Sequence, residues 1–117
     1  MIYKGSCHCG HIAFAVEGDL HGVIECNCSI CRRRGALRWF VARDHMHFST
    51  PESNLATCQF GKKRIKHHFC SICGCAPLGT GTHNGVEMAA IIVCCQERVD
   101  LPSLKVQQVD GRSLQYV

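Results

Sequence analysis

Seven of the eleven cysteines lie in three tight clusters, and this spacing limits what the chain can fold into more than any other feature. The clusters are Cys7-His8-Cys9, Cys26-Asn27-Cys28-Ser29-Ile30-Cys31 and Cys70-Ser71-Ile72-Cys73. Cysteines one or two residues apart rarely form structural disulfides with each other, whereas such spacings recur at metal sites. The odd total, and an N-terminal stretch without the apolar segment of a signal peptide, favour a reducing cytoplasm. We therefore predict metal thiolates instead of a disulfide scaffold.

The clusters divide into a group of four cysteines and a group of three. The first and third clusters each supply two sulfurs, which together make a closed site of the kind that holds structural zinc: Cys7, Cys9, Cys70 and Cys73. The second cluster supplies three ligands and leaves a fourth position open, as at catalytic zinc sites: Cys26, Cys28 and Cys31. Gly10 and Gly74 give the backbone the freedom to curl around an ion. We predict two zinc ions per chain.

Spacing alone leaves other arrangements open. Cys28 and Cys31 could instead join the third cluster, or a histidine could close the three-cysteine site and make it structural. The histidines near the clusters are His8, His11, His67 and His68. We expect the remaining cysteines to be buried apolar residues; these are Cys58, Cys75, Cys94 and Cys95.

The apolar pattern is short and punctuated, which predicts an all-β domain with metal-bearing loops between strands. Strand-like segments span residues 12–16, 37–42, 55–60, 64–69 and 88–95. The last of them is apolar on both faces, as a central strand would be. Residues 29–34 could form one helical turn, and no long amphipathic helix is visible. The length of 117 residues suits a single domain, residues 1–117. No apolar run reaches the length of a membrane span.

Arginines follow the second cluster directly. Zinc with three thiolates carries a net charge of about −1, which is costly to bury without a compensating cation. Arg32, Arg33 and Arg34 come straight after Cys31, and Arg38 lies close behind. At least one arginine could face the thiolates and another could hold a substrate carboxylate, and the alternative for each is a solvated basic face. The net charge of +4 permits an anionic ligand and makes nucleic acid an unlikely partner.

The motifs GSCHCG, CNCSICRRRG and HHFCSICGCAPLG resemble those of the glutathione-dependent formaldehyde-activating family, to which the centromere protein V domain is related. The resemblance extends from Lys4 to about Leu104. It includes Phe69 before the third cluster, and Gly74 and Pro77 after it. It implies a β-tent fold of short antiparallel strands with two zinc ions. It also implies that Cys7, Cys9, Cys70 and Cys73 hold the structural zinc, and Cys26, Cys28 and Cys31 the catalytic one.

The family resemblance further implies a carbon–sulfur lyase that condenses glutathione with formaldehyde to S-(hydroxymethyl)glutathione. On this interpretation a small thiol takes the open position and loses its proton, and His67, His68 or His83 passes a proton to the new hydroxymethyl oxygen. Arg32, Arg33 and Arg34 would bind the thiol substrate or offset its charge. The alternative is a non-catalytic zinc module that binds protein or nucleic acid through the arginines and the basic run at residues 62–66.

Overall fold

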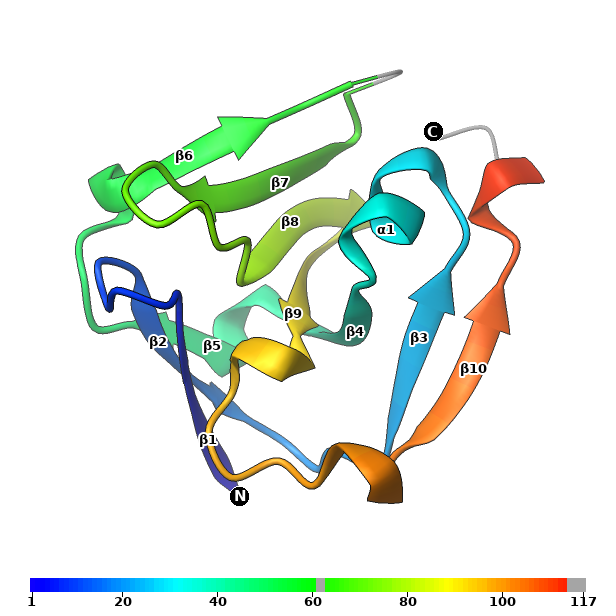
Figure 1. The fold of residues 1–117 in the computed structure, drawn as a ribbon, viewed down its shortest axis with the longest axis horizontal. Helices are drawn as coiled ribbons and strands as arrows, with labels where there is room; N and C mark the ends of the chain where they lie inside the picture. Colours follow the sequence, from blue (N-terminus) through cyan, green and yellow to red (C-terminus); the bar gives the residue numbers. More distant parts are fainter. Residues whose placement is uncertain (61–62, 114–117) are drawn as a thin grey trace.

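The computed structural model describes residues 1–60 and 63–113, and short strands make up most of this part of the chain (Figure 1). One α-helix, α1 (Ser29–Arg34), lies between the third and fourth strands, at the residues where one helical turn was expected. The strands are β1 (Ile2–Ser6), β2 (Ala13–Glu17), β3 (Gly22–Cys26), β4 (Leu37–Ala42), β5 (Met46–Phe48), β6 (Leu55–Cys58), β7 (Ile65–Cys70), β8 (Leu78–His83), β9 (Val86–Ile92) and β10 (Lys105–Val109). Five short 3-10 helices lie between or after them: η1 (Arg43–His45), η2 (Glu52–Asn54), η3 (Val93–Cys95), η4 (Leu101–Ser103) and η5 (Gly111–Ser113). The all-β prediction is therefore confirmed.

The strands form two sheets that lean against each other, as in the β-tent fold. The smaller sheet has the order β1-β2-β5 and the larger one β10-β3-β4-β9-β8-β7-β6. Neighbouring strands are antiparallel with one exception, since β10 runs parallel to β3. The expectation of antiparallel strands alone is thus incomplete. The chain crosses from β9 through η3 and η4 to the far edge of the large sheet and enters beside β3 in the same direction (Figure 1).

One tight turn sets the register in the middle of the large sheet. β8 and β9 are joined by Asn84 and Gly85, whose φ angles are +51° and +79°. Two consecutive positive φ angles belong to the type I′ turn, which suits the twist of a two-residue hairpin and favours the Asn-Gly sequence. His83 pairs with Val86 directly beside the turn. This hairpin places β9, the most apolar strand, between β8 and β4.

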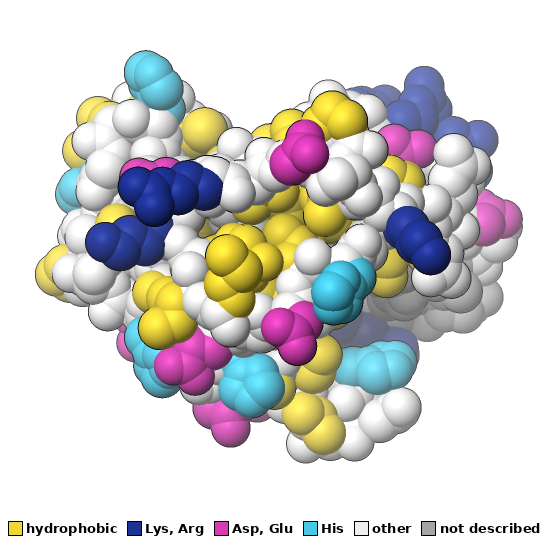
Figure 2. Space-filling view, turned by 90° about the horizontal axis from the view of Figure 1, so that it is seen from below, with side chains coloured by type: hydrophobic (Ala, Val, Ile, Leu, Met, Phe, Trp, Pro, Cys, Tyr) yellow, Lys and Arg dark blue, Asp and Glu magenta, His cyan; other side chains and the backbone are white. Residues whose placement is uncertain are grey.

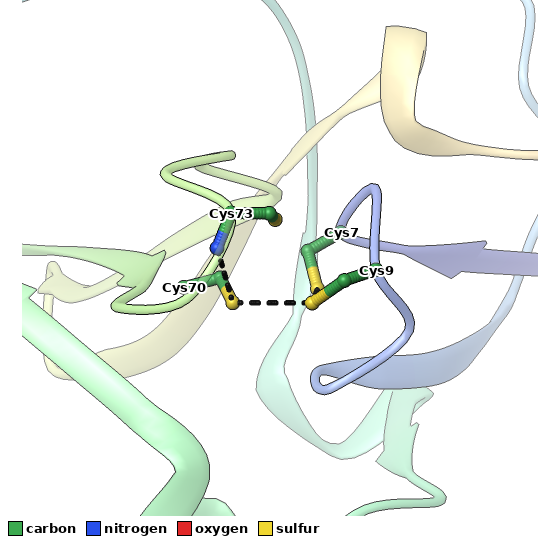
Figure 3. Close-up of side chains that lie close together, drawn as sticks. All are labelled: Cys7, Cys9, Cys70 and Cys73. Atoms are coloured by element: carbon green, nitrogen blue, oxygen red, sulfur yellow. Dashed lines mark hydrogen bonds between the residues drawn. The ribbon is translucent and has the colours of Figure 1, made fainter.

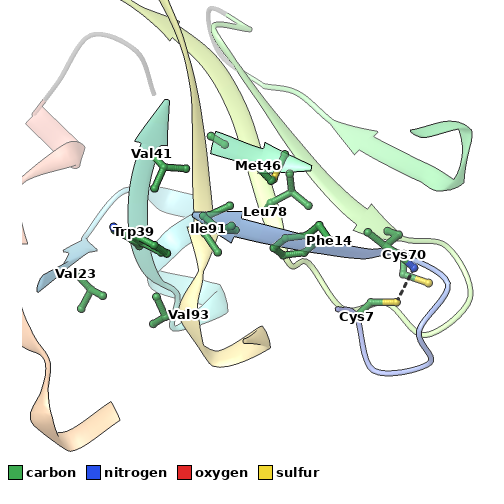
Figure 4. Packing of buried hydrophobic residues seen from close by; sticks show 13 residues of the cluster. Cys7, Phe14, Val23, Trp39, Val41, Met46, Cys70, Leu78, Ile91 and Val93 are labelled. Carbon is green, nitrogen blue, oxygen red and sulfur yellow. Dashed lines mark hydrogen bonds between the residues drawn. The ribbon is translucent and has the colours of Figure 1, made fainter. Parts of the chain in front are cut away.

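The hydrophobic core lies between the two sheets (Figure 4). Trp39, Val41 and Ile91 point inward from the large sheet, and Phe14 and Met46 meet them from the small one. Because side chains alternate along a strand, the residues between these inward positions face the opposite side of the large sheet. Among the described residues, no helix has both the length and the apolar character needed to cross a membrane.

The opposite face of the large sheet is hollow because the two middle residues of its central row, Ala90 and Gly79, have a small side chain or none. The row runs from Phe40 through Ala90 and Gly79 to His67 in neighbouring strands. A Cβ atom on Gly79 would meet the Lys66 carbonyl oxygen at 3.2 Å, so the strands here tolerate little more than hydrogen. The space-filling view from below shows the surface hollowed between two lobes, with hydrophobic side chains in and beside the hollow (Figure 2).

The segment expected to be one strand through Cys95 ends earlier. β9 stops at Ile92, and the next three residues form η3. Cys94 is exposed and Cys95 half-buried, as are Cys58 and Cys75. The expectation that these four cysteines are buried apolar residues is therefore wrong. Hydropathy cannot show the change of direction, since Val93, Cys94 and Cys95 are as apolar as the strand before them.

Candidate metal centres and the cavity between them

The four-cysteine cluster joins two loops that are far apart in the sequence (Figure 3). Cys7 and Cys9 lie between β1 and β2, and Cys70 and Cys73 lie at the end of β7. The sulfur of Cys9 is 3.7 Å from that of Cys7 and 3.6 Å from that of Cys70, and all four sulfurs lie within 4.8 Å of one another. Tetrahedral zinc with sulfur ligands requires sulfur–sulfur separations of roughly 3.8 Å. The donor set therefore fits a zinc ion.

Backbone amides in both loops point at these sulfurs. The amide of Ile12 donates to Cys7 at 3.3 Å, and those of Ile72 and Cys73 donate to Cys70 at 3.4 Å. Gly74 allows the second loop to close, since its φ of +80° is left-handed. Hydrogen bonds from the backbone amides of Cys75 and Cys9 lower the pKa of Cys73 to about 6. Such donors favour the thiolate, which is the form that binds metal.

The three-cysteine cluster is Cys26, Cys28 and Cys31, and it is buried. Cys26 ends β3 and Cys31 lies in α1, so a single loop brings the three sulfurs within 4.8 Å of one another. Burial opposes ionisation of Cys28, but the amides of Cys31 and Ile30 and the neighbouring thiols lower its pKa. Burial raises the pKa of Cys31 to about 12, against the opposing charge of Arg38. A bound cation would favour the thiolate of Cys31 and so lower this pKa.

The structure keeps the two clusters apart. In the part of the chain that it describes, no histidine or carboxylate joins the three-cysteine cluster, and neither Cys28 nor Cys31 joins the third cluster. Three sulfurs suit a zinc ion that has one further position, which matches the division expected from the spacing.

A segment near the end of the described chain covers the three-cysteine cluster. The Asn27 side chain donates to the Asp110 carboxylate at 2.9 Å and accepts from the Arg112 amide at 2.9 Å. Gly111 between them is buried, and a Cβ atom there would collide with the Cys26 sulfur. Sequence reasoning missed Gly111, because nothing near it in the sequence points to a contact with Cys26.

A cavity of about 330 Å³ opens beside Cys31, on the hollow face of the large sheet. Gly79 and Ala90 contribute to it from the central row described above. Cys31 and Arg34 contribute from α1, and Arg38 and His67 from strands β4 and β7. Cys75, Cys94 and Cys95 also line it. Of the three cluster cysteines Cys31 lines this cavity, so the cavity adjoins the three-cysteine cluster.

Arg38 is the most unusual side chain in this cavity. Only 6% of it is exposed, its guanidinium lies 5.0 Å from the centre of the Phe40 ring, and its Nε has no hydrogen-bond partner among the described residues. A buried guanidinium without an anion is costly. Its charge favours the thiolate of Cys31 and disfavours a protonated His67. Arg38 is therefore positioned to balance negative charge at the three-cysteine cluster.

The arginines after Cys31 point in different directions. Arg34 lines the cavity beside Cys31. Arg32 and Arg33 line a separate depression together with Arg112, and Arg33 donates to the Ser29 carbonyl at 2.9 Å. Arg32 and Arg33 therefore lie on a different side of α1 from Arg34. Arg34 and Arg38, four residues apart, are the two that reach the cavity.

The three histidines considered as proton carriers also separate. His67 lines the cavity, and burial, with the charges of Arg38 and Arg34, lowers its pKa to about 4. His68 points to the opposite face of the sheet, where its ring nitrogens lie 3.0 Å from the Thr57 hydroxyl and 2.8 Å from that of Thr80. His83 is exposed at the far end of β8. Only His67 of the three lies beside the three-cysteine cluster.

The basic run at residues 62–66 does not form a purely positive surface. Lys62 lies outside the described residues. Lys63, Arg64 and Lys66 line a second cavity on the His68 side, and Glu52 and Glu87 line it too. Mixed charge of this kind is unlike the basic stripe of a nucleic-acid interface.

Two comparisons with known proteins match most of the chain. The model of the family described as glutathione-dependent formaldehyde-activating enzyme matches residues 2–107. A crystal structure of a Rhodobacter sphaeroides protein, determined as a structural genomics target, is 32% identical in sequence with a TM-score of 0.77. The match covers 89% of this chain and 99% of that one.

Proposed function

Because this chain belongs to the glutathione-dependent formaldehyde-activating family, we propose that it condenses a thiol, with glutathione as the first candidate, with formaldehyde or another small aldehyde. The reaction forms a carbon–sulfur bond. It is the reverse of the bond cleavage for which carbon–sulfur lyases are named. The observation that carries the proposal is the three-cysteine cluster beside a cavity whose wall contains the buried Arg38, with an Nε that has no hydrogen-bond partner among the described residues. Residues 1–117 would act as one domain, in a reducing compartment such as the cytoplasm.

The two clusters would have different tasks. Cys7, Cys9, Cys70 and Cys73 would hold a structural zinc ion, while Cys26, Cys28 and Cys31 would hold a second ion at the cavity. When bound there, zinc supplies a positive charge that favours the thiolate form of a substrate thiol at neutral pH. Arg38 offsets the charge of the thiolates, and the small residues Gly79 and Ala90 in the cavity wall leave room for the aldehyde.

His67 is neutral at physiological pH, since its pKa is about 4. A neutral imidazole donates one hydrogen bond and accepts one, so His67 can orient an aldehyde oxygen or a hydroxymethyl group in the cavity. It is a weak base, so the thiol proton would go to solvent and the new hydroxymethyl oxygen would take a proton back from solvent. The proposed role of His67 is therefore to position the substrate.

The test is a titration of the cobalt-substituted protein with glutathione. Sulfur ligands of cobalt give intense charge-transfer absorption, so a thiol that enters the three-cysteine site should increase this band. S-methylglutathione, which has no free thiol, should leave the band unchanged. Arg38→Gln should weaken glutathione binding by roughly tenfold, which is about 1.4 kcal/mol, because the added negative charge loses its cation. Arg33→Gln, on the outer side of α1, is the matched control.

A band that does not respond to glutathione would contradict the proposal and leave a purely structural pair of zinc sites. A response that depends equally on Arg33 and Arg38 would contradict the placement of charge in the cavity. For turnover, exchange between free and hydroxymethylated glutathione, followed by NMR in the presence of formaldehyde, should be faster with the zinc-loaded protein than with Cys28→Ser.

A further inference from the structure

The cavity beside Cys31 contains positive charge and, among the described residues, no negative charge from a carboxylate. Arg34 and Arg38 line it, and none of the described residues in its wall is an aspartate or a glutamate. The third basic side chain, His67, is neutral at physiological pH because its pKa is about 4. A ligand in the cavity therefore lies beside two guanidinium groups and no carboxylate of the described chain.

The charges that act on His67 agree with this description of the wall. They come from Arg38, Arg34 and His68, which are all basic side chains. His68 itself, on the other face of the sheet, has the carboxylate of Glu52 among the charges that act on it. The excess of positive charge is thus a property of this cavity and not of both faces of the sheet.

The two arginines of the cavity differ in burial and in what they face. Arg38 is buried, and its charge favours the thiolate of Cys31. Arg34 is exposed at the end of α1, where it lines the cavity. The ion pairs found among the described residues do not include Arg34. Arg38 thus balances charge at the cluster, and the guanidinium of Arg34 is available to an anionic group of a ligand.

The remainder of the described wall is mainly apolar. Several of its residues are aliphatic: Ile30, Ala36, Leu78, Ala90 and Ile92. A charged group beside apolar side chains loses hydration, and an opposite charge is needed to offset this loss. A carboxylate finds that charge in Arg34, whereas an ammonium group finds no partner in the described wall and is repelled by both arginines.

We propose that the thiol substrate is an anionic thiol whose carboxylate binds the guanidinium of Arg34 and which has no ammonium group near its sulfur. This inference rests on the proposed function, because it concerns the thiol that enters the three-cysteine site. Mercaptocarboxylates without an amine and N-acylated cysteines have this chemistry. Glutathione belongs to the second class, since its cysteine nitrogen is an amide and its ammonium lies at the far end of the γ-glutamyl group. Free cysteine does not belong to either class.

The experiment titrates the cobalt-substituted protein, at physiological ionic strength, with two thiols that have the same two-carbon link. These are 3-mercaptopropionate, which ends in a carboxylate, and thiocholine, which ends in a quaternary ammonium that cannot bind the metal. From the sulfur-to-cobalt band, 3-mercaptopropionate should bind at least roughly tenfold more tightly, as expected for a hydrogen bond to a charged group.

Arg34→Gln identifies the residue responsible. Because the two thiols also differ in acidity, the deciding quantity is the ratio of their dissociation constants in the variant compared with the wild type. This preference for 3-mercaptopropionate should fall by roughly tenfold in Arg34→Gln. Arg33→Gln, which removes the same charge from the outer side of α1, is the matched control and should keep the wild-type ratio.

The possible failures of this inference and of the proposed function are distinguishable. Equal affinities for the two thiols, an unchanged ratio in Arg34→Gln or an equal change in Arg33→Gln would overturn the inference and leave the proposed function standing. A band that responds neither to these thiols nor to glutathione would contradict both. Circular dichroism and metal content should be the same for the two variants and the wild type, since both arginines are exposed.

Discussion

His67 shows at the scale of one residue how the cavity affects stability. The folded protein holds the pKa of His67 at about 4, against 6.5 for an unperturbed histidine, because of burial and of the charges of Arg38 and Arg34. Between these pH values the unfolded chain binds more protons than the folded one, so the free energy of unfolding falls as the pH falls. His67→Gln should therefore lose less stability over this interval, by on the order of 1 kcal/mol after allowance for water in the open cavity.

Urea denaturation of His67→Gln at a series of pH values, at equal zinc content, measures this difference. His47→Gln, an exposed position on β5, provides the comparison and should follow the wild-type curve. Parallel curves for His67→Gln and the wild type would mean that the ring is not held neutral in the folded state.

The sequence predicts how the cysteines are grouped but not how the arginines are oriented. The spatial grouping of the seven cysteines was predictable because spacings of one or two residues confine the cysteines of each cluster to a single loop. The orientation of the arginines was not, since it depends on where α1 ends and β4 begins. Gly35, with a φ of +64°, ends the helix, and β4 then points Arg38 into the cavity. Arg38 appeared in the sequence only as one basic residue among four.

At the scale of elements, the cover formed by β10 and η5 holds the three-cysteine loop. Gly111→Ala adds a methyl group where the Cys26 sulfur lies, so the cover or the sulfur must move. We expect zinc affinity at the three-cysteine site to fall by roughly tenfold or more, in the range seen when residues that support metal ligands are changed. Competition with a chromophoric chelator resolves this loss from the tighter four-cysteine site.

Arg112→Ala is the matched control for this prediction. It truncates a neighbouring side chain in the same turn, and the amide that donates to Asn27 remains. Equal zinc affinities for Gly111→Ala and the wild type would show that the cover is not in contact with the site in solution.

Elements were only partly predictable. The strand segments follow from alternation and turn residues, whereas the parallel pairing of β10 with β3 does not. That pairing brings together residues more than eighty positions apart, as Asn27 and Asp110 show by their separation of 83. Long-range partners leave no periodic trace in a single sequence, and β10 itself is largely exposed.

At the scale of the whole molecule, the two clusters should differ in what they hold together. The four-cysteine cluster links the loop of the small sheet to the end of β7 in the large one, whereas the three-cysteine cluster lies within a single loop. Cys73→Ser should therefore unfold or aggregate the protein, since a structural zinc site contributes on the order of 10 kcal/mol to folding. Cys28→Ser should stay folded and lose one metal ion.

Circular dichroism with metal analysis on both variants tests this difference, and Ser71→Ala, beside Cys70 and exposed, controls for changes in the third cluster that spare its sulfurs. Equal destabilisation by Cys28→Ser and Cys73→Ser would show that the two sites share the structural task.

The position of Gly111 also has a consequence for biosynthesis. The chain emerges from the ribosome with its N-terminus first. All four sulfurs of the four-cysteine cluster are therefore outside the ribosome once Cys73 has emerged. The three-cysteine loop emerges earlier still, but its cover lies on residues 105–112, which are translated among the last of those described. During translation these three thiols are thus exposed to the chaperones, metal carriers and electrophiles of the cell for longer than any other part of the site.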